Sequence, residues 1–329
     1  MKSRMFGLRA RVNREGIEMK TTLKTVGLAI GVTALATTAG IAQDKIKIGF
    51  SQGTMESSWR VNMVEGNRIW AEENLPDVEL IITNGENNAS KQVSDVESLL
   101  AQGIEVLIIS PVTADALTPV VKQAMDAGVP VLTLDRKVNT PVTVHIGADN
   151  VLIGKTAGEF VCETLGGEGN VIEIQGTAGA SATVDRHDAF HAVLAEKCPG
   201  VKVIADQVAN YVREPAIKFM EDMLQRFPSG EIDLVYAHND DMALGAVTAL
   251  QAAGRLDEVK VVGIDGENAA YDAINEGTMV ATFTYHFVAP EGVQYGYKVA
   301  KGEAVDAEIV LPTHQVDANN VADWLGKGF

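Results

Sequence analysis

The chain contains two stretches, more than a hundred residues apart, with the same order of apolar and polar positions. In each, a short continuous run of Val, Ile and Leu leads through a helical stretch and a glycine into a second such run. The first stretch spans residues 105–136 and the second spans residues 232–266. Continuous apolar strands separated by helices are typical of parallel sheets that helices cover on both faces.

The same alternation of strands and helices extends over most of the chain. Apolar runs predict strands over residues 45–51, 78–83, 105–111, 129–136, 142–147, 171–175, 201–206, 234–237, 259–264 and 279–285, with a last extended stretch at 309–315. Helical spacing and capping residues predict helices over residues 59–73, after 88, before Gly128, from Asn150, from Asp185, after Pro215, before Gly254 and over 290–301. The elements together predict an α/β fold with two doubly wound parallel-sheet domains.

The alternation restarts near residue 147, which suggests a domain crossing there. A late helix flanked by strands returns the chain to the first domain and out again, so a three-segment hinge is expected. We therefore predict an N-terminal lobe of residues 43–146 and 286–309 and a C-terminal lobe of residues 147–285 and 310–329. No linker rich in Ser, Pro or Gly separates them.

Hydrogen-bonding and aromatic side chains follow several of the predicted strands. Asp135 and Arg136 end one strand of the first domain, and Asn239 and Asp265 end two neighbouring strands of the second. Ligands of parallel sheets bind off the carboxyl ends of the strands, so these groups are expected to line a cleft from both sides. A carboxylate beside a planar guanidinium group suits the vicinal hydroxyl groups of a sugar.

Aromatic residues near the same ends complete the predicted cleft, because an aromatic face packs well on the C–H face of a sugar ring. These are Trp59 beside Arg60, and Tyr211 and Tyr285, each at the end of a strand. Each candidate has a structural alternative. The three aromatic residues fit core packing, the carboxylate and guanidinium of the first domain fit an interdomain salt bridge, and a helix N-cap suits Asp240 better than Asp265.

The N-terminal 42 residues resemble an export signal. A short basic start at residues 19–24, an apolar stretch at 26–39 and the small residues Gly40-Ile41-Ala42 predict a signal peptide cleaved near Ala42. Residues 1–18 carry five cations, as expected of an upstream mis-assigned start. The alternative is a disordered extension.

The net charge of the chain indicates which classes of partner are excluded. The whole chain has a net charge of −17, and residues 1–42 hold seven basic and two acidic residues, so the remaining 20 basic and 42 acidic residues give −22. Such a chain is repelled by nucleic acid and anionic lipid. We expect a freely diffusing monomer with no nucleic-acid partner.

Cysteines and histidines provide few clues. Cys162 and Cys198 fit a disulfide and two buried free thiols equally well. The six histidines are interpreted as scattered without a metal-ligand spacing, so no metal and no cofactor are expected. The loop at residues 175–181 lacks the full glycine pattern of a dinucleotide site, and P-loop, H-E-x-x-H and G-x-S-x-G motifs are absent.

Several of these segments together carry a resemblance. They are Asn87-Asn88, Leu134-Asp135-Arg136, Ala148-Asp149-Asn150, Gln175-Gly176 with Gly179, Asp185-Arg186, residues 237–246 and Val262-Gly263-Ile264-Asp265-Gly266. The combination resembles the ribose-type (type I) periplasmic sugar-binding proteins of ABC importers. Ser58-Trp59-Arg60, the run at residues 175–181 and residues 236–242 are most similar to the galactofuranose-binding branch.

The resemblance implies a periplasmic protein without catalysis, which captures a monosaccharide and delivers it to a membrane permease, with a chemoreceptor as a further expected partner. It implies ligand contacts from the following residues: Trp59, Arg60, Ser110, Asp135, Arg136, Arg186, Tyr211, Asn239, Asp265 and Tyr285. Ser110 stands where ribose binders have Asn, and Tyr285 where they have Gln, which argues against ribose. Arg60 in place of a second aromatic adds a charged donor and favours a sugar with an extra exocyclic hydroxyl group.

Two rival functions remain at this stage. A secreted enzyme acting on a sugar or nucleoside would need an unpaired carboxylate or a metal cluster, whereas each acidic candidate is expected to have an Arg or amide neighbour. A sugar-responsive transcription repressor would carry a helix-turn-helix and a basic N-terminus. The predicted export signal argues against the repressor.

Overall fold

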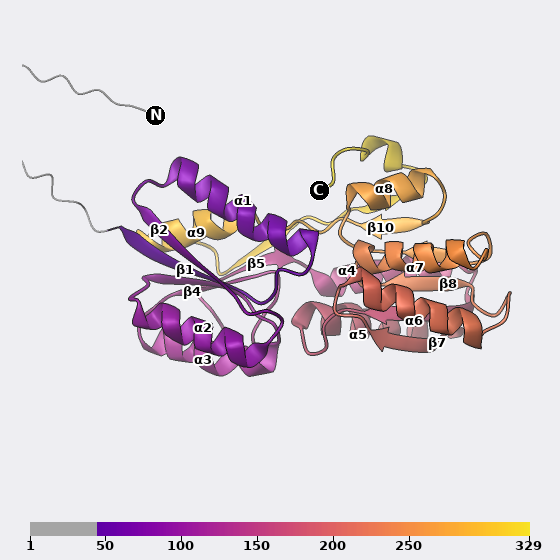
Figure 1. Cartoon of the computed structure of the whole chain (residues 1–329), viewed down its shortest axis with the longest axis horizontal. Helices are drawn as coiled ribbons and strands as arrows, with labels where there is room; N and C mark the ends of the chain where they lie inside the picture. Colours follow the sequence, from indigo (N-terminus) through magenta and orange to yellow (C-terminus); the bar gives the residue numbers. More distant parts are fainter. Residues whose placement is uncertain (1–44) are drawn as a thin grey trace, which may run out of the picture. The chain divides into compact units, whose positions relative to one another are not determined.

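The computed structural model describes residues 45–329, and the predicted signal peptide lies outside this range. Two six-stranded sheets organise the described chain (Figure 1). The first is fully parallel in the order β11-β5-β4-β3-β1-β2. Its strands are β1 (Ile46–Gln52), β2 (Val78–Asn84), β3 (Val106–Ser110), β4 (Val131–Leu134), β5 (Val144–Ala148) and β11 (Glu308–Leu311).

The second sheet has the order β12-β10-β9-β8-β6-β7. Its strands are β6 (Glu168–Gln175), β7 (Gly200–Val208), β8 (Leu234–Ala237), β9 (Lys260–Val262), β10 (Ala281–Phe283) and β12 (Gln315–Asp317). All neighbours are parallel except β12, which pairs antiparallel with β10. Strands and helices of both sheets therefore match the predicted α/β fold.

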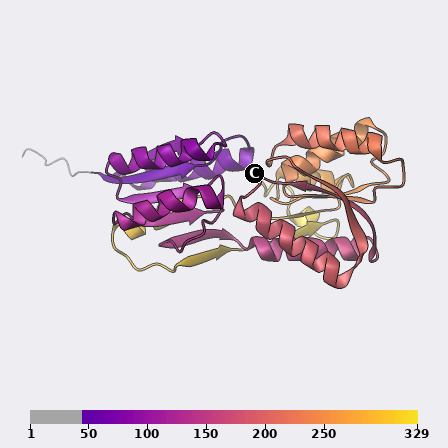
Figure 2. The same ribbon diagram turned by 90° about the horizontal axis from the view of Figure 1, so that it is seen from below.

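Helices cover both faces of each sheet, as Figure 2 shows from a second direction. The first sheet carries α1 (Ser58–Asn74), α2 (Ala89–Ala101), α3 (Ala114–Asp126) and α9 (Glu291–Ala300). The second carries α4 (Asn150–Thr164), α5 (Ser181–Lys197), α6 (Arg213–Arg226), α7 (Asp240–Ala252) and the short α8 (Asn268–Asn275). Within residues 45–329, no helix has the length and apolar character needed to cross a membrane.

Alternate residues of one strand pack against opposite helix layers. In β3, Val106 and Ile108 belong to the core with α1 and α9, whereas Leu107 and Ile109 belong to the core with α2 and α3. All five β3 residues are buried, because side chains alternate between faces and both faces are covered. This double burial explains why the strands are continuous apolar runs.

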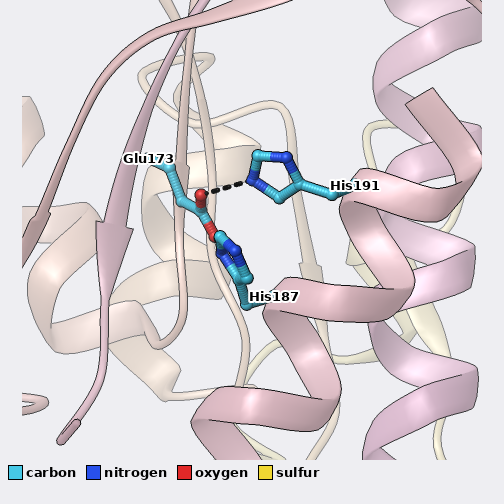
Figure 3. A group of neighbouring side chains, drawn as sticks. All are labelled: Glu173, His187 and His191. Carbon is cyan, nitrogen blue, oxygen red and sulfur yellow. Dashed lines mark hydrogen bonds and ion pairs between the residues drawn. The ribbon is translucent and has the colours of Figure 1, made fainter. Parts of the chain in front are cut away.

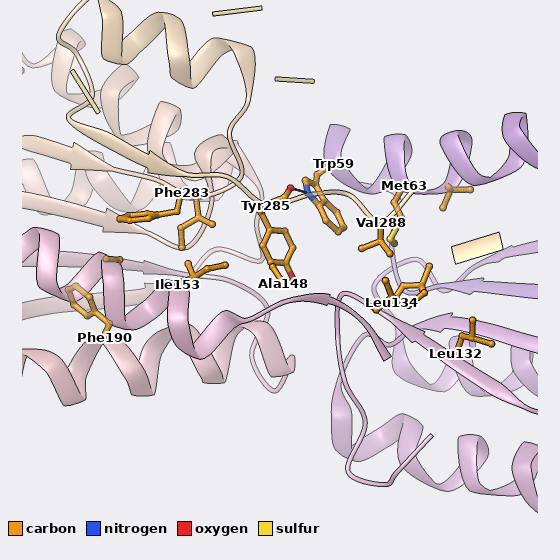
Figure 4. Packing of buried hydrophobic residues seen from close by; sticks show 14 of the residues in the cluster. Trp59, Met63, Leu132, Leu134, Ala148, Ile153, Phe190, Phe283, Tyr285 and Val288 are labelled. Carbon is orange, nitrogen blue, oxygen red and sulfur yellow. Dashed lines mark hydrogen bonds between the residues drawn. The ribbon is translucent and has the colours of Figure 1, made fainter. Parts of the chain in front are cut away.

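One hydrophobic cluster continues from the first sheet to the second. Ala148 and Ile153 lead into the second sheet along one crossing, and Tyr285 and Val288 lie along another (Figure 4). The chain also passes from β11 in the first sheet to β12 in the second. The division into lobes at residues 146, 285 and 309 stays a prediction.

Several predicted elements differ from the structure. The stretch at residues 309–315 was expected to be one extended segment, but it contains the end of β11 and the start of β12, in different sheets. Helix α5 begins at Ser181, four residues before the expected start. Helix α8 was missed, although Ala270, Tyr271 and Ile274 bury one helical face.

A disulfide joins Cys162 in the last turn of α4 to Cys198 directly after α5. Sequence alone left this bond and two free thiols open. The bond closes a loop with a sequence separation of 36 and ties together the two helices on one face of the second sheet.

We expect reduction of this disulfide to lower the free energy of unfolding by about 2–4 kcal/mol, because the reduced unfolded chain regains loop entropy. Urea denaturation with and without reductant measures the change. The Cys162→Ser/Cys198→Ser double variant should show the lower stability in both conditions. Equal stability of oxidised and reduced wild-type protein would contradict the expectation.

Candidate functional site

A narrow pocket is lined by residues from elements that pack on both sheets. Eight of the ten predicted site residues line it, together with Ser57 and Ala182, which sequence reasoning missed. The eight are Trp59, Arg60, Asp135, Arg186, Tyr211, Asn239, Asp265 and Tyr285. Ser110 and Arg136 lie behind this wall and contact its members.

The pocket residues on the side of the first sheet form its first wall, and those on the side of the second sheet form its second wall. Asp135 makes the central hydrogen bonds of the first wall. It follows β4 with a φ of 63°, a left-handed conformation that Asp tolerates better than most residues. Its Oδ2 accepts from Arg60 Nη1 at 2.5 Å and from Ser110 Oγ at 3.4 Å, while its Oδ1 accepts from the Tyr285 hydroxyl at 2.6 Å. The carboxylate thus joins α1, β3 and the segment after β10.

Opposing effects act on the Asp135 carboxyl group. Burial disfavours its charge, but the positive charges of Arg60 and Arg136 outweigh burial and hold the pKa below its usual value. Burial, reinforced by the Asp135 charge, raises the pKa of Tyr285 well above its ordinary value, so the phenol remains a donor. The pair is therefore a carboxylate that accepts and a hydroxyl that donates.

Trp59 is held beside Tyr285, one of the hydrogen-bond partners of Asp135. The hydroxyl of Ser57 caps α1 by accepting from the Arg60 backbone N–H, which starts the helix directly before Trp59. The Trp59 indole donates to the Tyr285 carbonyl at 3.0 Å, and the two rings are 5.4 Å apart (Figure 4). Trp59 is 4% exposed and belongs to the core, yet it also lines the pocket. The core interpretation of this residue is confirmed, and its contact with a ligand stays a prediction.

Arg136 does not face the pocket. Its Nη1 donates to the Val112 carbonyl at 2.9 Å, and its guanidinium stacks 5.4 Å from the Tyr211 ring. Its Nε lies 3.8 Å from Asp135. The short salt bridge of Asp135 is formed with Arg60 in the first turn of α1. Both cationic partners of Asp135 lie on the side of the first sheet, so the alternative of an interdomain salt bridge is not what these two residues form.

Arg186 on α5 anchors the second wall. Its Nε donates to Asn150 Oδ1 at 2.8 Å, its Nη1 donates to the His238 carbonyl, and its guanidinium stacks 4.5 Å from the Tyr285 ring. Asn150 in turn donates to the Tyr285 hydroxyl at 3.2 Å. Asn150 thus links both walls, a role that sequence reasoning missed. The signal was its position after Ala148-Asp149, where we identified only a helix start.

The position of the Tyr211 ring explains why residue 176 is a glycine. A Cβ built on Gly176 would lie 2.0 Å from the Tyr211 ring, so only glycine lets the ring cross this loop. The Tyr211 hydroxyl bonds Thr183 Oγ1 at 2.8 Å. Its φ of 64° is strained for a bulky residue and is offset by these contacts. The loop therefore seats an aromatic side chain, consistent with the absence of a dinucleotide motif.

The N-cap expectation at the second wall needs correction. Asn239, not Asp240, caps α7, since its Oδ1 accepts from the Met242 backbone N–H at 3.0 Å. Its amide group lies on the pocket side and is 3.4 Å from the Tyr211 carbonyl. Asp240 is buried and accepts from the Gly266 and Glu267 backbone N–H groups. Asp240 therefore fixes the turn that follows Asp265.

Asp265 is the free acceptor of the pocket. Within residues 45–329, its carboxyl group makes no hydrogen bond or ion pair, but the positive charge of Arg186 lies near enough to favour its ionised form, so the expected Arg neighbour is present without a direct contact. Burial, with the charge of Asp240 adding to it, raises its pKa well above the ordinary value. A pocket-lining carboxyl group without a partner is set to receive hydroxyl donors from a ligand.

Comparison with known proteins adds independent information. The family model "Periplasmic binding protein domain" matches residues 48–304. The ribose import binding protein of Escherichia coli (strain K12) is 36% identical over 290 residues, covering 87% of this chain and 95% of that protein. The galactofuranose-binding protein of the same organism is 35% identical over 240 residues, covering 70% and 74%. A solved fructose-binding periplasmic domain of a hybrid two-component system has a TM-score of 0.80 at 33% identity, covering 86% and 94%.

The carboxyl group of Glu267, in the turn that follows Asp265, is expected to make the stability of the protein depend on pH. Burial and the charges of Asp240 and Asp241 raise its pKa from 4.5 to about 8. The folded state then holds a proton that the unfolded state releases above pH 4.5, so this stabilisation is complete below 4.5 and is lost as the pH rises to about 8. We expect Glu267→Gln to reduce the loss of stability between pH 6 and 8 by about 1–2 kcal/mol.

Urea denaturation of both proteins at pH 6 and pH 8 measures this difference. The exposed Glu79→Gln variant, which removes a carboxylate on the first sheet, should keep the wild-type pH dependence. If Glu267→Gln loses as much stability as wild type over this range, Glu267 is ionised in the folded protein.

Proposed function

Because the chain belongs to the periplasmic binding protein domain family, we propose that its pocket captures one monosaccharide in the furanose form, related to galactofuranose, for a specific ABC permease. The chain is a sugar-binding periplasmic protein of the ABC transporter type. It is not an enzyme, since its relatives are solute-binding proteins, and this excludes the sugar- or nucleoside-cleaving alternative. Family membership likewise confirms the predicted two-domain type I fold.

The observation that carries the proposal is the mixture of donors and acceptors in the pocket. Arg60 and Arg186 are charged donors from opposite walls, and Asp135 and Asp265 are acceptors. A sugar hydroxyl group is both donor and acceptor, so each hydroxyl of a ring can pair with one acceptor and one donor. The Trp59 ring on the same pocket offers an apolar surface for the ring C–H groups.

The preference for a sugar with an additional exocyclic hydroxyl group rests on Arg60, and the furanose form is suggested by the galactofuranose-binding relative. Its guanidinium is fixed by Ser110 and Asp135, so its remaining N–H groups have set directions. A charged donor in this place favours a ligand with an exocyclic hydroxyl group, such as galactofuranose, over ribose.

Two further parts of the proposal concern export and partners. We propose that residues 1–42 direct export and are removed near Ala42, which agrees with the periplasmic location of the family. Delivery to a membrane permease follows from the same family, and a signalling receptor is a second candidate partner, supported by the hybrid two-component relative.

Closure of the two lobes over the ligand is the mechanism we propose. Two contacts join the rims of the cleft: the Ala114 backbone N–H donates to the Gly179 carbonyl at 3.1 Å, and the Lys137 backbone N–H donates to Ser181 Oγ at 2.7 Å. A ligand that touches both walls shifts the equilibrium toward the form that has these contacts.

Removal of a pocket charge tests the binding site. We expect Asp135→Asn and Arg186→Ala each to weaken binding of the best monosaccharide at least about tenfold, or 1.4 kcal/mol, because each leaves a buried partner unpaired. Asn suits the left-handed backbone at position 135, so the fold should survive. A thermal-shift screen selects the sugar, and calorimetry then measures its affinity. The exposed Asp126→Ala and Arg226→Ala serve as charge-matched controls, and wild-type affinity in both pocket variants would place the site elsewhere.

Loss of a rim contact tests closure without touching the sugar. We expect Ser181→Ala to weaken binding about two- to tenfold, since one hydrogen bond contributes about 0.5–1.5 kcal/mol to the closed form. Small-angle scattering should show wild-type protein becoming more compact when it binds the selected sugar. Superimposable scattering profiles with and without saturating sugar would contradict closure.

A further inference from the structure

A cluster of one carboxylate and two imidazoles lies on the second sheet, apart from the pocket. Glu173 on β6 faces His187 and His191 on α5 (Figure 3). Glu173 Oε1 lies 2.9 Å from His187 Nδ1, and Glu173 Oε2 lies 2.8 Å from His191 Nε2. None of the three lines the sugar pocket. The interpretation that the histidines have no metal-ligand spacing is therefore wrong, because two of them are four residues apart on one helix face.

The three side chains are arranged like a partial set of ligands around a metal ion. Their ligand atoms all lie within 4.8 Å of one another, and the two imidazole rings are 4.2 Å apart. Zinc bonds of about 2.0–2.2 Å in a tetrahedron place neighbouring ligand atoms about 3.3 Å apart. The two distances from the carboxylate to the imidazoles are shorter than this spacing, so each imidazole would move away from the carboxylate by a few tenths of an ångström to admit an ion.

Glu173 is well prepared for a cation. It is fully buried, and both of its oxygen atoms already contact imidazole nitrogens, Oε1 that of His187 and Oε2 that of His191. His238 Nε2 also contacts Oε1 at 2.9 Å, which fixes the carboxylate from behind as outer partners fix metal ligands. His238 itself is fully buried.

Solvent access to the two imidazoles and the negative net charge of the protein also favour metal binding. The side chains of His187 and His191 are 35% and 38% exposed, so an ion can enter from solvent and a water molecule can fill a fourth position. Two nitrogen ligands favour zinc-like transition metals over calcium or magnesium, which take oxygen ligands. The net charge of −17 attracts cations to the protein as a whole.

We propose that Glu173, His187 and His191 bind one divalent transition-metal ion of the zinc type. The three ligands are distinct from the residues that line the sugar pocket. Its ligands come from the strand and helix that meet on one face of the second sheet, so the ion would join β6 to α5.

Titration with zinc chloride tests the proposal. The untagged protein is stripped with a chelator and titrated in a calorimeter, where we expect one ion per chain with micromolar or tighter affinity. His187→Gln and His191→Gln should each weaken binding at least about tenfold, which corresponds to 1.4 kcal/mol. Both residues are half-buried, so the variants should fold, as circular dichroism would verify. The exposed His314→Gln should bind zinc like wild type.

Cobalt(II) gives a second measurement that reports the ligand set directly. Visible absorption bands of bound cobalt should appear in wild type and His314→Gln and be absent in His187→Gln and His191→Gln. Absence of stoichiometric zinc binding to wild type overturns the proposal and leaves the histidines as neutralisers of the buried carboxylate. Zinc binding that persists unchanged in both variants overturns it as well.

Discussion

The buried carboxylate of Asp135 is the interaction on which the rest of the site depends. An ionised group without water is costly unless charged donors surround it, and breaking one partner of a buried pair is more damaging than replacing both. Here Arg60, Ser110 and Tyr285 supply the donors, and they come from α1, β3 and the segment after β10. One charge therefore sets the position of three elements that are far apart in the sequence.

The chain of contacts does not stop at Tyr285. Asn150 bridges its hydroxyl to Arg186, and Arg186 donates to the carbonyl of His238, whose imidazole bonds Glu173. The wall of the pocket and the cluster on the far side of β6 are thus connected through one histidine. Both ends of this series are buried, so a change of charge at one end is weakly screened by solvent at the other.

Sequence alone predicts those parts of the molecule that local pattern determines. The apolar runs identify β3 and β8 because both faces are buried, and the strand ends identify Asp135, Asn239 and Asp265 because parallel strands share a polarity. Trp59, Arg60 and Arg186 line the same pocket from helices, and Arg186 was identified only through the family resemblance.

What sequence alone misses depends on distant pairing or on side-chain direction. Strands β11 and β12 are short and half exposed, so their separation into two sheets follows from their partners. The roles of Asn239 as cap and Asn150 as bridge depend on rotamers that no pattern specifies. The unpaired state of Asp265 is equally invisible, and only family membership separates it from a catalytic carboxylate.

The late return of the chain to the first sheet has a consequence for biosynthesis. Helix α9 packs on β3, with Gly296 close to Ile108 and Ile48, and β11 and β12 complete the two sheets from the last portion of the chain. A nascent chain that emerges from the ribosome lacks these pieces until translation is almost finished. Domains usually fold in N-to-C order during synthesis. Here the first domain cannot complete its fold until the C-terminal part of the chain has been synthesised.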